Sequence, residues 1–183
     1  MFDAEAITSF TDYVLAAASL SFAIAIGRSI GPHNRVSAWF WCAAFIAAAV
    51  AGAAGGTFHF LDSASGDAAR QPLWTTVLVS MGAFGAFVTA GIHAAYVQRK
   101  DGTVQWLVSG IAVTLIGATV QGLRLPLNQW LDHNGVYHLI QIVGLYLFYR
   151  CACTVHDRPG LPLTHREAQW TSRETQSRRA RIR

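Results

Sequence analysis

The sequence predicts an all-α integral membrane protein, a helical bundle of about five transmembrane helices. Hydrophobic residues make up 52% of its 183 residues and charged residues only 13%, which is not the composition of a soluble globular domain. Runs of about 20 mostly apolar residues are long enough to cross a ~30 Å hydrocarbon core as helix. The sequence contains such runs at residues 8–30, 38–60, 74–97, 104–123 and 134–154.

The first run, residues 8–30, is expected to remain as a helix rather than to be removed as a signal peptide. Its amino end carries Asp3 and Glu5, and its first basic residue, Arg28, lies near its end, whereas a signal peptide begins with basic residues. Asp12 lies inside this run. We expect its side chain to face the other helices, because a carboxylate in contact with lipid is costly.

The second run, residues 38–60, ends in the stretch GAAGGTFHFLD. Ala48, Gly52 and Gly56 recur at every fourth position, a spacing of small residues that lets two helices approach closely. His59 follows close to this stripe. The pattern therefore predicts that His59 lies inside the bundle.

The third and fourth runs both contain polar residues, and we interpret those of each run differently. His93 lies toward the far end of residues 74–97, and we interpret it as a hydrogen-bonded packing residue. In residues 104–123 and just beyond, Gln121 and Arg124 continue one helical stripe. This stripe is expected to reach the end of the bundle at which the second run finishes.

The fifth run, residues 134–154, begins within the polar stretch DHNGVYHLIQ. Asn134, His138 and Gln141 follow the i, i+4, i+7 spacing that places side chains on one face of a helix. Polar groups at this depth must face protein or water rather than lipid. This face is therefore predicted to point into the bundle.

Four helices are thus expected to bring polar groups to one level near one end of the bundle. The set comprises Asp12, His59, Gln121 or Arg124, and His138, with Asp62, Asp132 and His133 just above it. One interpretation is a structural network of interhelical hydrogen bonds, each worth about 1 kcal/mol or less. The other is a metal site, because imidazole nitrogens and carboxylate oxygens are the ligands of catalytic zinc. A haem held between two helices would use His93 and is a weaker alternative, because no histidine on a neighbouring helix matches the level of His93 in an obvious way.

Two stretches carry a resemblance to a known group of proteins. GTFHFLD and DHNGVYHLIQIVGLYLFYR resemble bacterial membrane proteins that are distantly similar to the alkaline ceramidase and adiponectin-receptor superfamily of membrane hydrolases. That superfamily usually has seven helices, and its final two histidines are four residues apart. Here His133 and His138 are five apart, and Gly55 stands where a serine is usual.

The resemblance implies a zinc-dependent hydrolase of lipid amides or esters. Carried over to this sequence, His59, His138 and His133 would bind the zinc ion, and Asp12 or Asp62 would take a proton from the attacking water. Asn134, Gln141, Gln121 and Arg124 would be supporting polar residues. The alternative is a non-catalytic membrane protein, or a subunit of a larger complex, in which the polar cluster is structural.

The distribution of basic residues predicts the orientation of the chain. Lys and Arg collect between the first two runs, between the third and fourth, and after the fifth, and such residues mark the cytoplasmic side. The amino terminus is therefore expected outside and the carboxyl terminus inside a bacterial plasma membrane. Residues 1–155 form the transmembrane domain in this interpretation.

Residues 156–183 are predicted to form a flexible, Arg-rich cytoplasmic tail. Basic residues near an anionic leaflet gain about 1 kcal/mol each, so we expect the tail to contact anionic lipid headgroups. No nucleic acid is expected as a partner, because no reading module or aromatic platform accompanies the arginines.

We expect a reporter fused after Arg183 to be cytoplasmic and a reporter inserted at Ser65 to be external, because the basic segments alternate along the chain. Accessibility of the two reporters in intact cells measures this. Finding both on one side of the membrane would contradict the number or orientation of the predicted helices.

Overall fold

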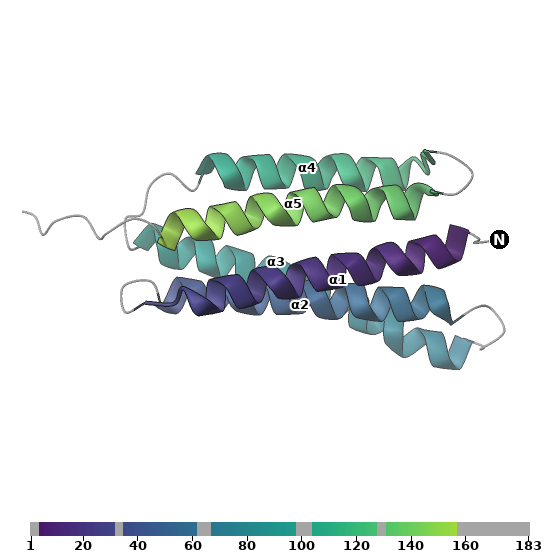
Figure 1. The fold of residues 1–183 in the computed structure, drawn as a ribbon, viewed down its shortest axis with the longest axis horizontal. Helices are drawn as coiled ribbons and strands as arrows, with labels where there is room; N and C mark the ends of the chain where they lie inside the picture. Colours follow the sequence, from purple (N-terminus) through teal and green to yellow (C-terminus); the bar gives the residue numbers. More distant parts are fainter. Residues whose placement is uncertain (1–3, 32–34, 62–66, 98–103, 128–130, 157–183) are drawn as a thin grey trace, which may run out of the picture.

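The computed structural model describes residues 4–31, 35–61, 67–97, 104–127 and 131–156. These residues form five helices. They are α1 (Ala4–Arg28), α2 (Arg35–Phe60), α3 (Asp67–Val97), α4 (Val104–Gly122) and α5 (His133–His156). Each is long and apolar enough to cross a membrane, and all five run along the long axis of the molecule (Figure 1). This confirms the prediction of an all-helical fold with five helices long and apolar enough to cross a membrane.

Four of the five helices, α1, α2, α3 and α5, begin before the apolar runs that predicted them. The largest difference is in α3, which begins at Asp67 rather than at residue 74. The added turns have the polar sequence DAARQP, so hydropathy could not detect them. They include Pro72, whose ring removes only the hydrogen bond to Ala68 near the start of the helix, where proline is tolerated best.

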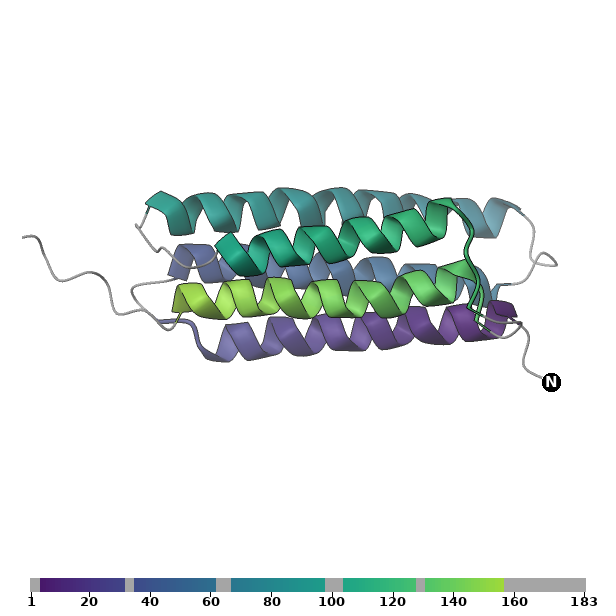
Figure 2. The same cartoon turned by 90° about the horizontal axis from the view of Figure 1, so that it is seen from above.

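The helices form two groups that meet along one seam. α2 packs against both α1 and α3, α4 packs against α5, and α5 joins the two groups by packing along α1. α3 has no comparable contact with α4 or α5. The start of α3 lies well away from α4 and α5 in Figure 1, whereas its other end lies nearer to them. Figure 2 shows the same five helices from above.

The start of α1 and the ends of α2 and α4 lie at one end of the bundle, together with the starts of α3 and α5. We call this the N-terminal end. The apolar core lies nearer the opposite end. At its centre the fully buried Phe45 contacts the rings of Phe22 and Phe84, with centroid distances of 5.5 and 6.5 Å. The buried aromatic cluster around Phe45 thus lies away from the polar side chains at the N-terminal end.

Glycines on α2 bring it into close contact with α1. A Cβ atom at Gly52 would lie 2.9 Å from the backbone oxygen of Asp12, and one at Gly56 would lie 3.1 Å from that of Ser9. Ser9 Oγ also donates a 2.7 Å hydrogen bond to the Gly56 carbonyl. The small-residue stripe therefore allows the close helix approach that was predicted from its spacing.

The end of α4 explains why Arg124 does not extend the polar stripe of that helix. Arg124 has a φ of 53°, the left-handed conformation of a helix C-cap. Its N–H donates to the Gln121 carbonyl, and the N–H of Leu125 donates to that of Val120. Arg124 is consequently exposed beyond the last helical turn, not on the face that carries Gln121.

Candidate functional site

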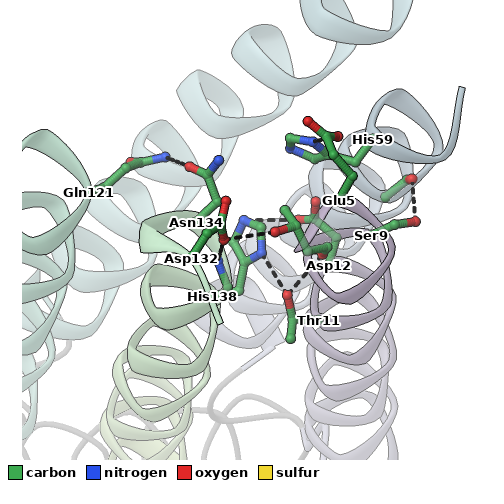
Figure 3. A network of polar contacts seen from close by, with 12 residues as sticks. Glu5, Ser9, Thr11, Asp12, His59, Gln121, Asp132, Asn134 and His138 are labelled. Atoms are coloured by element: carbon green, nitrogen blue, oxygen red, sulfur yellow. Dashed lines mark hydrogen bonds and ion pairs between the residues drawn. The ribbon is translucent and has the colours of Figure 1, made fainter. Parts of the chain in front are cut away.

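A carboxylate and an imidazole form a buried pair between α1 and α5. Asp12 Oδ1 lies 3.2 Å from His138 Nε2, and the two side chains are only 7% and 9% exposed. Figure 3 shows them facing each other across the space between the two helices. The pair thus joins the first helix to the last, along the seam between the two helix groups.

The hydrogen bonds around His138 determine which of its ring nitrogens carries a proton. Nδ1 lies 3.1 Å from the hydroxyl oxygen of Thr11, and that hydroxyl donates its own proton to the Thr8 carbonyl at 2.8 Å. A hydroxyl has only one proton to donate, so Nδ1 must be the donor to Thr11. The contact between Nε2 and Asp12 then holds one shared proton.

This arrangement makes the Asp12–His138 pair neutral overall. Whether the shared proton lies on Asp12 or on His138, the charges of the two groups sum to zero. A neutral pair suits a position that is almost completely buried, because an unpaired charge there would be costly. Asp12 Oδ2 is also buried, and no described residue forms a hydrogen bond with it.

Gly55 makes room for this carboxyl group. A Cβ atom at Gly55 would lie 3.0 Å from Asp12 Oδ2 and 3.1 Å from Oδ1, which is closer than ordinary van der Waals contact. Gly55 therefore admits the Asp12 side chain between α1 and α2.

A second carboxylate–histidine pair lies nearer the surface. His59 Nδ1 is 3.3 Å from Glu5 Oε2, with the histidine side chain 18% and the glutamate 68% exposed. A carboxylate oxygen can only accept a hydrogen bond, so Nδ1 carries the proton, and Nε2 of a neutral His59 keeps its lone pair. The exposed position makes this pair weaker than the buried one.

Asp132 caps α5 and joins it to α1. Its Oδ1 accepts a 2.8 Å hydrogen bond from the N–H of Gly135, which is the pattern of a helix N-cap. The same oxygen accepts a 2.9 Å bond from the hydroxyl of Thr8. This contact holds the start of α5 beside α1, close to the Asp12–His138 pair.

Amide side chains connect α4 to α5. Gln121 Nε2 donates to Asn134 Oδ1 at 3.2 Å, and Gln141 Nε2 lies 3.5 Å from the Thr114 carbonyl. These bonds cross the interface between the two helices. The polar faces predicted for the fourth and fifth helices therefore face each other.

A cavity of about 700 Å³ lies beside α3, and all five helices contribute to its wall. This volume is typical of a site for a small molecule. Polar groups occupy the wall toward the N-terminal end: Asp12, His59, Arg70, Gln71, Gln121, Asn134, Tyr137, His138 and Gln141. The rest of the wall is mainly apolar: Leu15, Ala48, Ala51, Phe58, Trp74, Val77, Leu78, Met81, Phe84 and Leu145.

Most of the residues predicted for the site line this cavity. Those that do are Asp12, His59, Gln121, Asn134, His138 and Gln141. His133 is the first residue of α5 and is not part of the wall. Arg124 is exposed beyond α4, and Asp62 lies outside the described residues.

The sequence predicted that Asp12 lies near His138, but it did not predict the contacts of Glu5 with His59 and of Thr11 with His138. Glu5 precedes Asp12 by two helical turns and shares its face of α1, so helical periodicity could have placed it there. Thr11 gives no such signal, because its contact with His138 depends on how α1 and α5 pack. Arg70 precedes the apolar run at residues 74–97, so hydropathy does not indicate that it lies on a helix.

The zinc site implied by the resemblance is not assembled among the described residues. They contain no group of three His, Cys, Asp or Glu side chains that could hold a metal ion. Both ring nitrogens of His138 already have protein partners, and His133 does not join His59 in the cavity wall. A catalytic zinc ordinarily has three protein ligands, so this arrangement does not fit one.

Replacing Asp12 by leucine should destabilise the protein by about 1–3 kcal/mol, because His138 loses a partner while remaining buried. Replacing both Asp12 and His138 by leucine should cost less than the sum of the two single changes. The free energy of unfolding in mixed detergent measures the coupling. A matched cycle of Asp12→Leu with Thr89→Val, on the exposed face of α3, should be additive; additivity in the Asp12–His138 cycle would contradict the pair.

Comparison with known proteins gives one match. Residues 7–92 and 83–156, two overlapping stretches that together include parts of all five helices, match a family model described as "Family of unknown function (DUF6962)". No curated protein and no solved structure matches the chain. Because the two stretches cover well over half of the sequence, the chain belongs to the DUF6962 family.

Proposed function

We propose that this protein is an integral membrane protein, with its amino terminus outside and its carboxyl terminus inside a bacterial plasma membrane, that binds a single lipid-like amphiphile in the cavity beside α3. The observation that supports this proposal is the composition of the cavity wall. This wall is polar toward one end and apolar elsewhere, which matches a molecule with a polar headgroup and a hydrocarbon chain.

The packing of α3 supports entry of such a molecule from the side. α3 packs against α2 but has no extended contact with α4 or α5. In a membrane, this side of the cavity would face the acyl chains. A lipid-like ligand could then enter without crossing the aqueous phase, with its headgroup at the level of His59 and His138.

Hydrolysis of an ester or amide in that headgroup is the reaction we propose for the site. His59 lines the cavity with Nε2 available, while Glu5 holds Nδ1. A water molecule would give a proton to Nε2 as its oxygen attacks the carbonyl carbon. The departing alcohol or amine would take that proton from His59 as the bond to carbon breaks.

Elemental analysis of the purified protein tests whether it binds the zinc ion that the resemblance implies. If it is bound, zinc would polarise the carbonyl and lower the pKa of a bound water. In the proposed reaction His59 takes up and releases the proton, and no step depends on a zinc ion.

Val77→Trp should abolish binding of a monoacylglycerol, because Val77 lines the cavity and an indole would fill part of it. Val79→Trp is the matched control, since Val79 lies two residues away on the same helix and is 66% exposed. Native mass spectrometry of the purified protein measures the bound amphiphile. Equal binding by the two variants would place the ligand outside the cavity.

His59→Ala should lower the hydrolysis of a medium-chain ester or N-acyl amide by about 10²-fold, the contribution typical of a general acid–base group. His93→Ala is the control, because His93 is exposed on α3 and does not line the cavity. Product formation in neutral-lipid nanodiscs and the zinc content of each variant are the measurements. Full activity of His59→Ala would contradict this role for His59.

A further inference from the structure

Arg70 is a cavity residue that neither pair uses. It lies in the first turns of α3, and its guanidinium carbon is 4.3 Å from the centre of the Phe58 ring. The side chain is half-buried, and its Nε atom is buried with no hydrogen-bond partner among the described residues. Among the same residues, no carboxylate forms an ion pair with it. Within the described part of the chain, the Phe58 ring is thus the recorded partner of this cation at the cavity wall.

An aromatic ring compensates only part of the cost of burying a cation. Contact with the face of a phenyl ring is worth about 0.5–2 kcal/mol, but it gives no acceptor to the buried Nε–H of this half-buried side chain, and a buried donor without an acceptor is costly. The unpartnered Nε of Arg70 thus indicates a missing acceptor, and the cavity is where an acceptor has room.

The charges around the polar end of the cavity point to the kind of acceptor. Asp12 and His138 share one proton and sum to zero. The Oε2 atom of Glu5 lies 3.3 Å from Nδ1 of His59, with which it forms a pair. Arg70 is left as a positive charge, and the N-terminal end of α3 adds the positive end of a helix dipole beside it. Glu5 and Asp132 do not line the cavity, so the charged groups of the wall itself sum to one positive charge, that of Arg70, where a headgroup would lie.

From this we infer that the ligand of the cavity carries an anionic headgroup, which Arg70 binds, and a single hydrocarbon chain. This rests on the proposed function, since it assigns the chemical class of the amphiphile bound in the same cavity. A phosphate or a carboxylate would meet the requirement, and a guanidinium binds either through two parallel hydrogen bonds. Trp74, whose ring lies 5.5 Å from Phe58, covers the next part of the wall, where the chain would begin.

The test compares amphiphiles that differ only in headgroup charge. The full-length protein in neutral-lipid nanodiscs is titrated with tritiated lysophosphatidate, in competition with dodecyl phosphate, dodecanoate and dodecanol. The variants are Arg70→Gln, Arg70→Lys and Arg150→Gln. Arg150 is a matched control because its guanidinium also lies over an aromatic ring, that of Trp106 at 4.7 Å, but it does not line the cavity.

The wild type should bind the two anions at least about tenfold more tightly than dodecanol, a difference of 1.4 kcal/mol. Arg70→Gln should remove this preference while leaving dodecanol binding unchanged, Arg70→Lys should retain part of it, and Arg150→Gln all of it. A stronger effect of dodecyl phosphate than of dodecanoate would identify phosphate as the headgroup, and the reverse would identify carboxylate.

Two results would overturn the inference, and they separate it from the proposed function. If the wild type binds dodecanol as tightly as the anions, or if Arg70→Gln weakens all three equally, the cavity binds amphiphiles but Arg70 does not select an anion. If no amphiphile binds the wild type, and Val77→Trp changes nothing, the proposed function fails together with the inference.

Discussion

The structure depends on a buried proton shared between the first helix and the last. Asp12 and His138 lie on the seam where α5 packs along α1, and this seam is the main contact between the two groups of helices. A carboxylate or an imidazole alone at this depth would be costly, whereas the pair is neutral and mutually satisfied. Thr11 and Thr8 extend the network to the backbone of α1. The positions of α4 and α5 relative to the other helices follow from this contact.

The cavity is a consequence of unequal packing around α2. Its glycines bring α1 so close that a single methyl group at Gly52 would meet the backbone of α1. On the other side, α3 packs on α2 but has few contacts with α4 and α5, among them that of Phe84 with Phe148. The helices are therefore close together on one side of α2 and further apart on the other. The Asp12–His138 pair, which joins α1 to α5, also forms part of the cavity wall.

Helical periodicity predicted the faces of the helices well but not their ends. The inward positions of Asp12, His138, Gln121 and Gln141 follow from a 3.6-residue repeat, because a polar group in an apolar helix must turn toward its neighbours. Arg124 departs from its stripe because the chain enters a left-handed cap that a repeat cannot foresee. The early start of α3 was hidden for a related reason, since its first turns are polar and hydropathy detects only apolar ones. The pairing of His59 with Glu5, rather than with His138, depends on helix tilt, which no local pattern specifies.

The same seam also imposes an order on assembly. Asp12 is synthesised with the first helix and His138 with the last, so the carboxyl group has no partner until nearly the whole bundle has emerged. In a chain whose helices enter a membrane one after another, α1 would carry an uncompensated acid, which on insertion scales costs about 2.5–3.5 kcal/mol at the centre of a bilayer and less nearer its surface. Packing of α5 along α1 would remove that penalty. A chain truncated before α5 would therefore keep an unsatisfied carboxyl group, by which an incomplete product would differ from a finished one.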